Sequence, residues 1–260
     1  MVSPMDTDFY MTTIRHDAEA MVDAARAAGL DAEVPTCPGW TVRDLMVHTG
    51  RVHRHKTEVV RGGYVDSDAA FPPRPDGDVL EWFVGGFDEM LDVFNKADLD
   101  APSWTWCDHE HNADWWVRRM AHETAIHGAD ALIAAERTPT VDDWLAIDGV
   151  DEILDEMMTG IPEWGTVKAG IKTVALDAGG RRWGLRTATF SGVGPDSGTA
   201  HEGLVTLLRD DAVDPDAVVR TDPETLYLWL WGRGELPSEA IAGDRSVVDH
   251  VRAVAVEATQ

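Results

Sequence analysis

Cysteine and lysine are scarce in this sequence of 260 residues. The two cysteines, Cys37 and Cys107, are too few for a disulfide framework or a four-cysteine zinc site. Secreted disulfide-rich scaffolds are therefore excluded, and we expect a reducing compartment. Lysine occurs only at positions 56, 96, 168 and 172, so arginine carries most of the positive charge.

Long hydrophobic runs and net positive charge are also lacking. No stretch of about 18 uncharged apolar residues occurs, and residues 1–10 do not resemble a signal peptide. The chain has 22 Lys and Arg against 47 Asp and Glu, a formal net charge of −25 that repels phosphate backbones and anionic membranes. We therefore expect a soluble, cytoplasmic protein that binds neither nucleic acid nor membranes.

The hydrophobic content of 44% is enough to build buried cores, and the first 140 residues are typical of helices. Apolar residues recur at intervals of three and four over residues 6–29, 42–61, 78–97 and 114–136. Thr41 is the expected N-cap of the second helix, with Asp44 completing a capping box. The segments 30–40 and 62–77 are expected to be loops. The pattern predicts a four-helix bundle over residues 1–140.

The sequence changes in character from about residue 147 onward. Short β-prone runs at 172–176, 181–188 and 217–221 stand among glycines, and helices are expected at 222–231 and 245–254. The natural break between domains falls at residues 138–145. The expected fold is therefore a four-helix bundle followed by a smaller α+β domain at residues 147–260.

The fourth predicted helix carries the densest chemical signal, in the segment RRMAHETAIHGADA. Glu123 and His127 are four residues apart, so they lie about 40° from each other on one helix face and can share one ion. His122 lies about 140° from His127, which excludes the zincin motif H-E-x-x-H. Here the glutamate would itself be a ligand, although such a pair on a helix is often only a surface ion pair.

Further ligands are available on the second predicted helix, which carries His48, His53 and His55. His48 and His55 share a face but are about 10.5 Å apart along the axis, so one helix cannot bring both to the same ion. One of these histidines with Glu123 and His127 would make a two-histidine, one-glutamate set. Such a set leaves coordination positions open, which is typical of catalytic zinc.

Other reactive or aromatic residues each have more than one interpretation. Cys37 is a candidate nucleophile or a small buried hydrophobic residue. Cys107, His109 and His111 precede the fourth helix and either add polar groups to a site entrance, form a second metal site, or lie in an exposed loop. The tryptophans Trp40, Trp115 and Trp116 are interpreted as core or turn-anchoring aromatics.

Three segments in order resemble the mycothiol-dependent maleylpyruvate isomerase family: TCPGWTVRDLMVHTGRVHR, RRMAHETAIHGADA and DPETLYLWLWGRG. The resemblance spans nearly the whole chain. It implies a metal-binding bundle related to the DinB-like thiol transferases, followed by a domain similar to sterol carrier protein folds.

The resemblance also implies roles for individual residues. By position in the motifs, the metal ligands fall on His48, Glu123 and His127, with Zn²⁺ the expected ion, and His53 and His55 would then lie at the pocket rim or surface. Arg233, in LWGR, resembles an arginine that would hold a substrate carboxylate in a bidentate pair. A solvent-facing arginine at a helix end is the alternative.

One position departs from the family pattern. The family commonly has arginine after its second metal-binding histidine, whereas Gly128 follows His127 here. We expect the pocket to differ at this point, because a bulky cation is missing.

The resemblance implies a metal-dependent enzyme with mycothiol as cofactor or co-substrate. A metal-bound thiolate would add to the cis double bond of a maleylpyruvate-like acid, and rotation and elimination would give the trans isomer. Thiol transfer to a small electrophile would use the same site. A metal-dependent hydrolase and a non-catalytic protein that binds small ligands are the alternatives from other classes.

Overall fold

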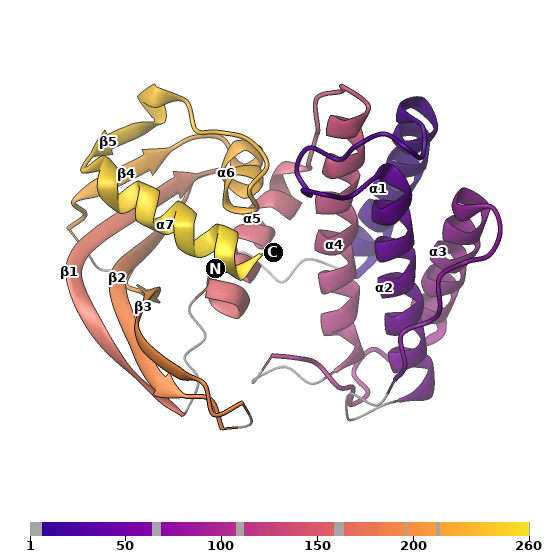
Figure 1. Cartoon of the computed structure of the whole chain (residues 1–260), viewed down its shortest axis with the longest axis horizontal. Coiled ribbons are helices and arrows are strands. Elements are labelled where there is room, and N and C mark those ends of the chain that lie inside the picture. Colours follow the sequence, from indigo (N-terminus) through magenta and orange to yellow (C-terminus); the bar gives the residue numbers. More distant parts are fainter. Residues whose placement is uncertain are drawn as a thin grey trace. The chain divides into compact units, whose positions relative to one another are not determined.

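The computed structural model describes residues 7–63, 69–107, 112–158, 164–195, 197–211 and 214–259. It divides into two compact units, residues 1–140 and 141–260. The first unit contains the helices α1 (Thr7–Ala28), α2 (Val42–Gly62), α3 (Val79–Lys96) and α4 (Ala113–Ala134) (Figure 1). The four predicted helices are confirmed, and their ends agree to within about two residues.

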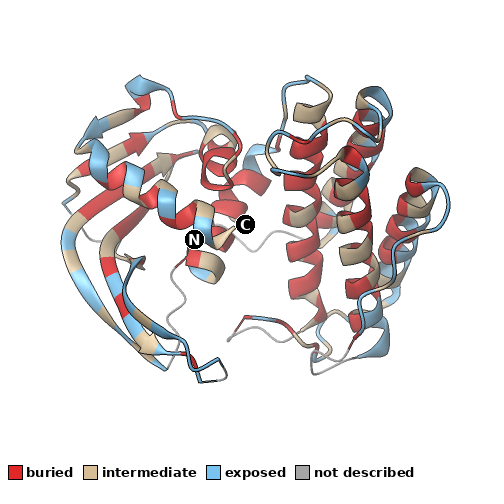
Figure 2. Cartoon of the chain, viewed as in Figure 1, coloured by how far each residue is buried: buried red, intermediate tan, exposed pale blue. Residues whose placement is uncertain are grey.

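Helix α4 packs against both α1 and α2, and α2 packs in turn against α3. Buried residues occur around most of the circumference of α4 (Figure 2), as expected for a helix covered on several sides. The core of the bundle includes Ile14, Met21, Leu45, Met46, Phe83, Trp116 and Met120. Side chains on the α2 and α4 faces that meet are therefore held by a packed core.

The start of α2 follows the predicted capping box. The Thr41 side chain accepts a hydrogen bond from the backbone N–H of Asp44, and the Thr41 N–H donates to the Asp44 carboxylate. The preceding loop folds back on itself, because the Val34 N–H donates to the Trp40 carbonyl at 2.9 Å. This turn fixes the position of Trp40 next to the first turns of α2.

The second unit is built on a five-stranded mixed sheet in the order β3-β2-β1-β4-β5. Its strands are β1 (Gly165–Ala178), β2 (Arg181–Val193), β3 (Ala200–Arg209), β4 (Ala217–Arg220) and β5 (Ile241–Gly243). Only the β1–β4 pair is parallel among the strands described. The helical elements are α5 (Asp143–Glu152), the π-helical η1 (Ile153–Met158), α6 (Pro223–Leu230), η2 (Ser238–Ala240) and α7 (Arg245–Ala258).

The expected α+β class of the second unit is confirmed, but its elements differ in detail. β1 and β2 extend well beyond the predicted runs 172–176 and 181–188, and β3 and β5 were not predicted. The predicted run at 217–221 and the helices at 222–231 and 245–254 correspond to β4, α6 and α7. Helix α5 begins at Asp143, before residue 147, where we place the second domain.

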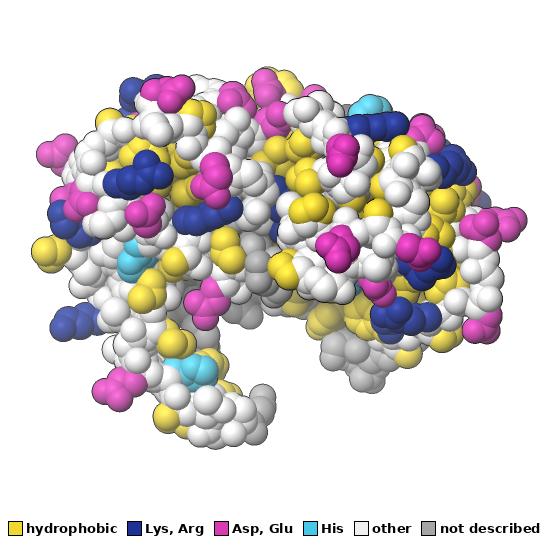
Figure 3. All heavy atoms as spheres, turned by 45° about the horizontal axis from the view of Figure 1, so that its top comes forward, with side chains coloured by type: hydrophobic (Ala, Val, Ile, Leu, Met, Phe, Trp, Pro, Cys, Tyr) yellow, Lys and Arg dark blue, Asp and Glu magenta, His cyan; other side chains and the backbone are white. Residues whose placement is uncertain are grey.

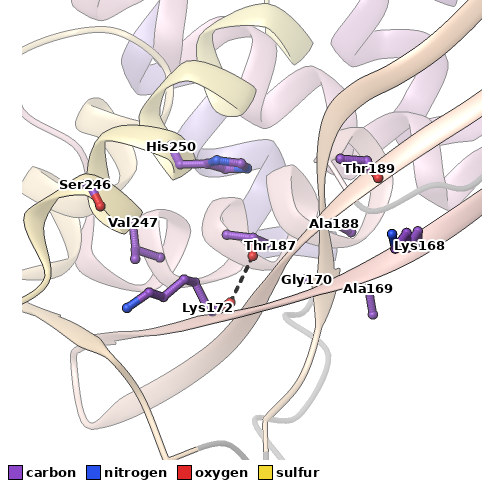
Figure 4. Close-up of a pocket in the computed structure, with 10 residues that line it drawn as sticks. All are labelled: Lys168, Ala169, Gly170, Lys172, Thr187, Ala188, Thr189, Ser246, Val247 and His250. Atoms are coloured by element: carbon purple, nitrogen blue, oxygen red, sulfur yellow. Dashed lines mark hydrogen bonds between the residues drawn. The ribbon is translucent and has the colours of Figure 1, made fainter.

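A pocket of about 400 Å³ opens in the second unit between β1, β2 and α7 (Figure 4). Lys168, Lys172 and His250 are among the residues that line it. The Lys172 ammonium lies 3.0 Å from Asp216 and 3.1 Å from Asp244, so its charge is balanced by these carboxylates. The pocket is therefore less positive than its two lysines suggest.

Acidic side chains are scattered over both units on the face shown in Figure 3, with arginines and lysines between them. On this face the negative charge is spread out and does not form one patch. Among the described residues, no helix combines the length and the apolar character needed to cross a membrane.

Candidate metal centre

The candidate centre is formed by one side chain from α2 and two from α4. His48 lies two turns into α2, and Glu123 and His127 lie one turn apart on α4. The Glu123 Oε1 atom is 3.4 Å from His48 Nε2 and 3.4 Å from His127 Nε2. The two imidazole rings meet edge to face with their centroids 5.0 Å apart. The structure thus brings the three predicted ligands together, with ligand atoms all within 4.8 Å of one another.

The spacing of these atoms fits a tetrahedral zinc ion. Two ligands bound at about 2.0–2.1 Å with a tetrahedral angle between them are about 3.3–3.4 Å apart, which matches both nitrogen–oxygen distances. Two imidazoles and one carboxylate form a donor set typical of catalytic zinc. Such a set leaves at least one position for a substrate or cofactor atom. The role of these three residues as metal ligands stays a prediction.

Asp130 positions His127 from the opposite side of the ring. Its Oδ2 atom is 3.0 Å from His127 Nδ1, so Nδ1 donates to the carboxylate and Nε2 points towards Glu123. The carboxylate is fully buried and also accepts hydrogen bonds from the Thr36 hydroxyl and, at 3.4 Å, from the Cys37 thiol. Outer carboxylates of this kind orient metal-binding histidines in many zinc sites. Sequence reasoning missed Asp130, although its spacing of three residues from His127 places both on one helix face.

Cys37 belongs to a second cluster that shares His127. The Cys37 thiol, the His127 ring and Asp130 also have ligand atoms within 4.8 Å of one another. However, the thiol and His127 Nδ1 both donate to Asp130, which is the pattern of a hydrogen-bonded carboxylate. We therefore interpret Cys37 as a half-buried donor to Asp130, the carboxylate that orients His127. Its alternative role as a nucleophile stays a prediction.

Arg119 fixes the second oxygen of Glu123. Its guanidinium donates to Oε2 at 2.7 Å, and its side chain is only 5% exposed. Oε1 is consequently left to face the two histidines. Arg119 lies four residues before Glu123, so the same helical spacing that pairs Glu123 with His127 pairs Glu123 with Arg119.

The cluster shifts the ionisation of its members in opposite directions. Burial raises the pKa of Glu123, but hydrogen bonds from His127 and His48 and the positive charges of His127 and Arg119 outweigh it and hold that pKa well below its ordinary value. Burial likewise lowers the pKa of His127, but hydrogen bonds to Asp130 and Glu123 outweigh it and raise that pKa to about 9. The ionised carboxylate is the form that binds a cation.

Trp40 forms a wall of this centre. Its ring centroid is 4.9 Å from that of His48 and 6.4 Å from that of His127, and it is nearly parallel to the His127 ring. The backbone N–H of Trp40 donates to the Cys37 carbonyl, so this residue takes part in the turn before α2. The contact with both histidines adds a second role, because an aromatic wall shields the site from water.

His53 and His55 do not lie at a pocket rim or on the surface, and that expectation was wrong. His53 is fully buried, with Nε2 3.0 Å from the Thr124 hydroxyl, and burial lowers its pKa to about 4. His55 is 3% exposed and stacks on Phe71, while its Nε2 donates to the Ala69 carbonyl at 2.7 Å. Both side chains are therefore buried and take part in packing α2 against its neighbours.

The segment before α4 is described only in part. Cys107 is buried, with its thiol 3.3 Å from the Thr105 hydroxyl, so the exposed-loop interpretation is wrong for this residue. His109 and His111 lie outside the described residues. Cys107 belongs to neither cluster of metal-binding side chains found in the described part of the chain.

Gly128 does not shape the metal centre in the way we expected from the family pattern. A Cβ atom at this position would lie 3.5 Å from the backbone carbonyl of Asp17 on α1. A side chain at this position would therefore begin by pointing towards α1, and the space beside Asp17 accepts a Cβ atom at an ordinary contact distance.

Arg233 belongs to the second unit, just after α6. Its side chain is 7% exposed and donates through Nη1 to the Trp231 carbonyl. The alternative of a solvent-facing arginine is therefore wrong. Its predicted role in binding a carboxylate stays a prediction.

Comparisons with known proteins cover almost the whole chain. The family model of the mycothiol maleylpyruvate isomerase N-terminal domain matches residues 11–132, and that of the MDMPI C-terminal domain matches residues 145–250. A comparison with curated protein sequences finds no match.

Among solved structures, the fold is similar to that of "the mycothiol-dependent maleylpyruvate isomerase" and of its histidine-to-alanine variant. The TM-scores are 0.56 and 0.57, with 13% identity, and each match covers 93% of this chain and 94% of the other. At this identity, the structural matches show a shared fold. Because the two family models together span both units, the chain belongs to the mycothiol-dependent maleylpyruvate isomerase family, a family of enzymes.

Proposed function

We propose that this protein is a metal-dependent enzyme that uses mycothiol to convert a maleylpyruvate-like cis-unsaturated acid into its trans isomer. The observation that carries the proposal is the convergence of His48, Glu123 and His127 around a point that fits zinc. Family membership supports the choice of thiol and of substrate class. A reducing cytoplasm would keep such a thiol available.

The three ligands would hold the ion, and the residues behind them would keep the site rigid. Asp130 keeps His127 Nε2 directed at the ion, and Arg119 keeps Glu123 Oε1 directed there. When bound, a zinc ion would supply a Lewis acid that lowers the pKa of a coordinated thiol, so that the thiolate nucleophile comes from the cofactor. No cysteine of the chain is then needed as the nucleophile.

We propose that Arg233 binds a carboxylate of the substrate. Its hydrogen bond to the Trp231 carbonyl restrains the guanidinium, and a planar guanidinium suits bidentate pairing with a carboxylate. An Arg233→Lys variant keeps the charge but loses the bidentate geometry. It should raise the KM for the acid more than it lowers kcat.

The test is turnover of a cis-alkene acid by the zinc-loaded protein in the presence of mycothiol. Trans product should form with mycothiol, and it should not form without it or after removal of zinc by a chelator. The Glu123→Gln variant should be inactive. An Asp88→Asn variant, changed at an exposed carboxylate on α3, should keep full activity.

Other outcomes would identify the alternatives. Stable thiol adducts with alkylating electrophiles, without isomerised acid, would contradict the isomerase and favour a thiol transferase. Turnover in thiol-free buffer would favour a hydrolase. Ligand binding that survives the change His48→Ala, without turnover of any substrate, would favour a non-catalytic binding protein.

A further inference from the structure

Lys56 is a buried lysine that forms no ion pair with any carboxylate of the described residues. It lies on α2 and is 7% exposed. In the described part of the chain its ammonium has no hydrogen bond or ion pair. By contrast, the exposed Lys96 and Lys172 lie 2.6 Å and 3.0 Å from aspartate oxygens. Buried ammonium groups are rare unless they are paired.

Three aromatic rings surround the Lys56 ammonium. Its Nζ atom lies 4.1 Å from the centroid of Trp116, 5.1 Å from that of Trp104 and 5.7 Å from that of Phe71. These rings attract a cation, but they do not provide the strong oxygen acceptors that three N–H donors require. Burial lowers the pKa of Lys56 to about 8, while Glu123 raises it and Arg119 lowers it. The group therefore still lacks an anionic acceptor.

The ammonium lies on the α4 side of α2, where it contacts Trp116. His48 and Lys56 both face α4, because His48 contacts Glu123 and Lys56 contacts Trp116. Trp116 precedes Glu123 by seven residues, about two turns on the same helix face. Side chains on helices lean towards the N-terminus, so Lys56 extends from its backbone towards the level of His48.

The charges around this position leave an excess of positive charge. Glu123 already pairs with Arg119 and contacts both histidine ligands, and Asp130 already accepts from His127. Among the residues that the structure describes, Lys56 has no such hydrogen-bonded partner. In a chain of net charge −25, a local excess of positive charge beside a metal centre favours an anionic ligand.

We propose that Lys56 binds a carboxylate of the substrate, and that it makes the enzyme selective for anionic unsaturated acids. The proposal rests on the proposed function, because it assigns to Lys56 a carboxylate of the substrate that would react at the metal centre. The substrate carboxylate would accept hydrogen bonds from the ammonium in the space between α2 and α4, while the reacting carbons lie nearer the metal. Lys56 is thus a specificity-determining residue of the first unit.

The test measures binding of maleate, a cis-dicarboxylate, to the zinc-loaded full chain by calorimetry without mycothiol. The Lys56→Met variant should bind maleate at least tenfold more weakly than the wild type. The Lys56→Arg variant, which keeps a cation, should bind with intermediate affinity. The Lys96→Met variant removes an exposed lysine and should bind like the wild type.

Zinc content and circular dichroism check that each variant is folded and loaded. Maleate affinity of Lys56→Met within twofold of the wild type would overturn the proposal, as would a wild type that binds no maleate at millimolar concentration. If Lys56→Met does not fold, the Lys56→Arg and Lys56→Gln pair replaces it, with the glutamine variant expected to be the weaker binder.

A kinetic measurement separates this proposal from the proposed function. In Lys56→Met, KM for the cis-unsaturated acid should rise at least tenfold, while turnover of a neutral electrophile should change less than twofold. Equal losses on both substrates would overturn the proposal. Should the wild type show no isomerisation at all, the proposed function fails, while maleate binding still tests Lys56.

Discussion

His127 Nδ1 lies 3.0 Å from Asp130 Oδ2, and this contact determines which ring nitrogen faces Glu123. Each ring nitrogen of His127 faces one carboxylate of α4: Nδ1 faces Asp130, and Nε2 faces Glu123. One helix therefore carries two of the three predicted metal ligands and also the carboxylate that orients one of them.

This arrangement predicts that Asp130 controls metal affinity without being a ligand itself. Changing Asp130 to Asn weakens the acceptor for His127 Nδ1, and we expect zinc affinity to fall about 10- to 100-fold. Competition with a chromophoric chelator measures the change. The Asp88→Asn variant should bind zinc like the wild type, and an unchanged affinity in Asp130→Asn would refute the positioning role.

The ligand set itself predicts metal content. Purified protein should contain about one equivalent of a divalent ion, most favourably zinc, and His48→Ala, Glu123→Gln and His127→Ala should each lose it. Elemental analysis after gel filtration provides the measurement. His16→Ala, at an exposed histidine of α1, is the control, and full occupancy in all three ligand variants would remove the site assignment.

The buried imidazole of His53 should make the protein less stable at acidic pH. Burial lowers its pKa to about 4 in the folded protein, from an ordinary value of 6.5. The unfolded chain therefore binds more protons than the folded one between those values, and the stabilising contribution is lost as the pH falls from about 6.5 to 4. At about 1.4 kcal/mol per pKa unit, the effect is at most about 3.5 kcal/mol.

Urea unfolding with chelator present, at pH 7 and pH 4.5, measures this effect for the wild type and for His53→Gln. The glutamine does not titrate and can still bond to Thr124. Between pH 7 and pH 4.5, the wild type should therefore lose more unfolding free energy than His53→Gln does. A difference that does not depend on pH would contradict the assignment.

The buried ammonium of Lys56 should make the stability of the protein depend on pH in the alkaline range. Its folded-state pKa of about 8 lies below the ordinary value of 10.5, so the unfolded chain binds more protons between those values. The wild type should gain stability relative to Lys56→Met as the pH rises from about 8 to 10.5, by at most about 3.5 kcal/mol. Denaturation curves of the wild type and of Lys56→Met at pH 7.5 and pH 10 provide the test. An equal difference in unfolding free energy at the two pH values would argue that the lysine is not desolvated.

Gly128 predicts a small gain in stability on substitution by alanine. The added Cβ would make an ordinary contact with the Asp17 carbonyl, and alanine is favoured over glycine inside a helix by about 1 kcal/mol. The unfolding midpoint of Gly128→Ala should therefore rise while zinc content stays unchanged. A lower midpoint would show that α1 and α4 cannot accept the methyl group.

The sequence predicted the helical unit better than the sheet. The four helices follow from apolar spacing and from the Thr41 cap, which are local signals. β3 has exposed residues along most of its length, so it lacks the alternation that identifies a half-buried strand. β5 has only three residues, too few for any periodicity.

The candidate site shows the same division between local and long-range information. The spacing of Glu123 and His127 is visible in one helix, and the choice of His48 came from the family resemblance. The burial of His53, His55 and Lys56 depends on segments that are distant in sequence, such as Ala69 and Phe71 of the loop after α2 and Thr124 of α4. No local pattern predicts such contacts.

The separation of the ligands along the chain has a thermodynamic consequence. His48 and Glu123 are about 75 residues apart, and an ion held by both would act as a removable cross-link that closes this long loop. Ion binding would then favour the native bundle by mass action. The melting temperature of the helical unit should then depend on the concentration of free zinc. The supply of the ion would thus affect how long the folded protein persists, as well as its chemistry.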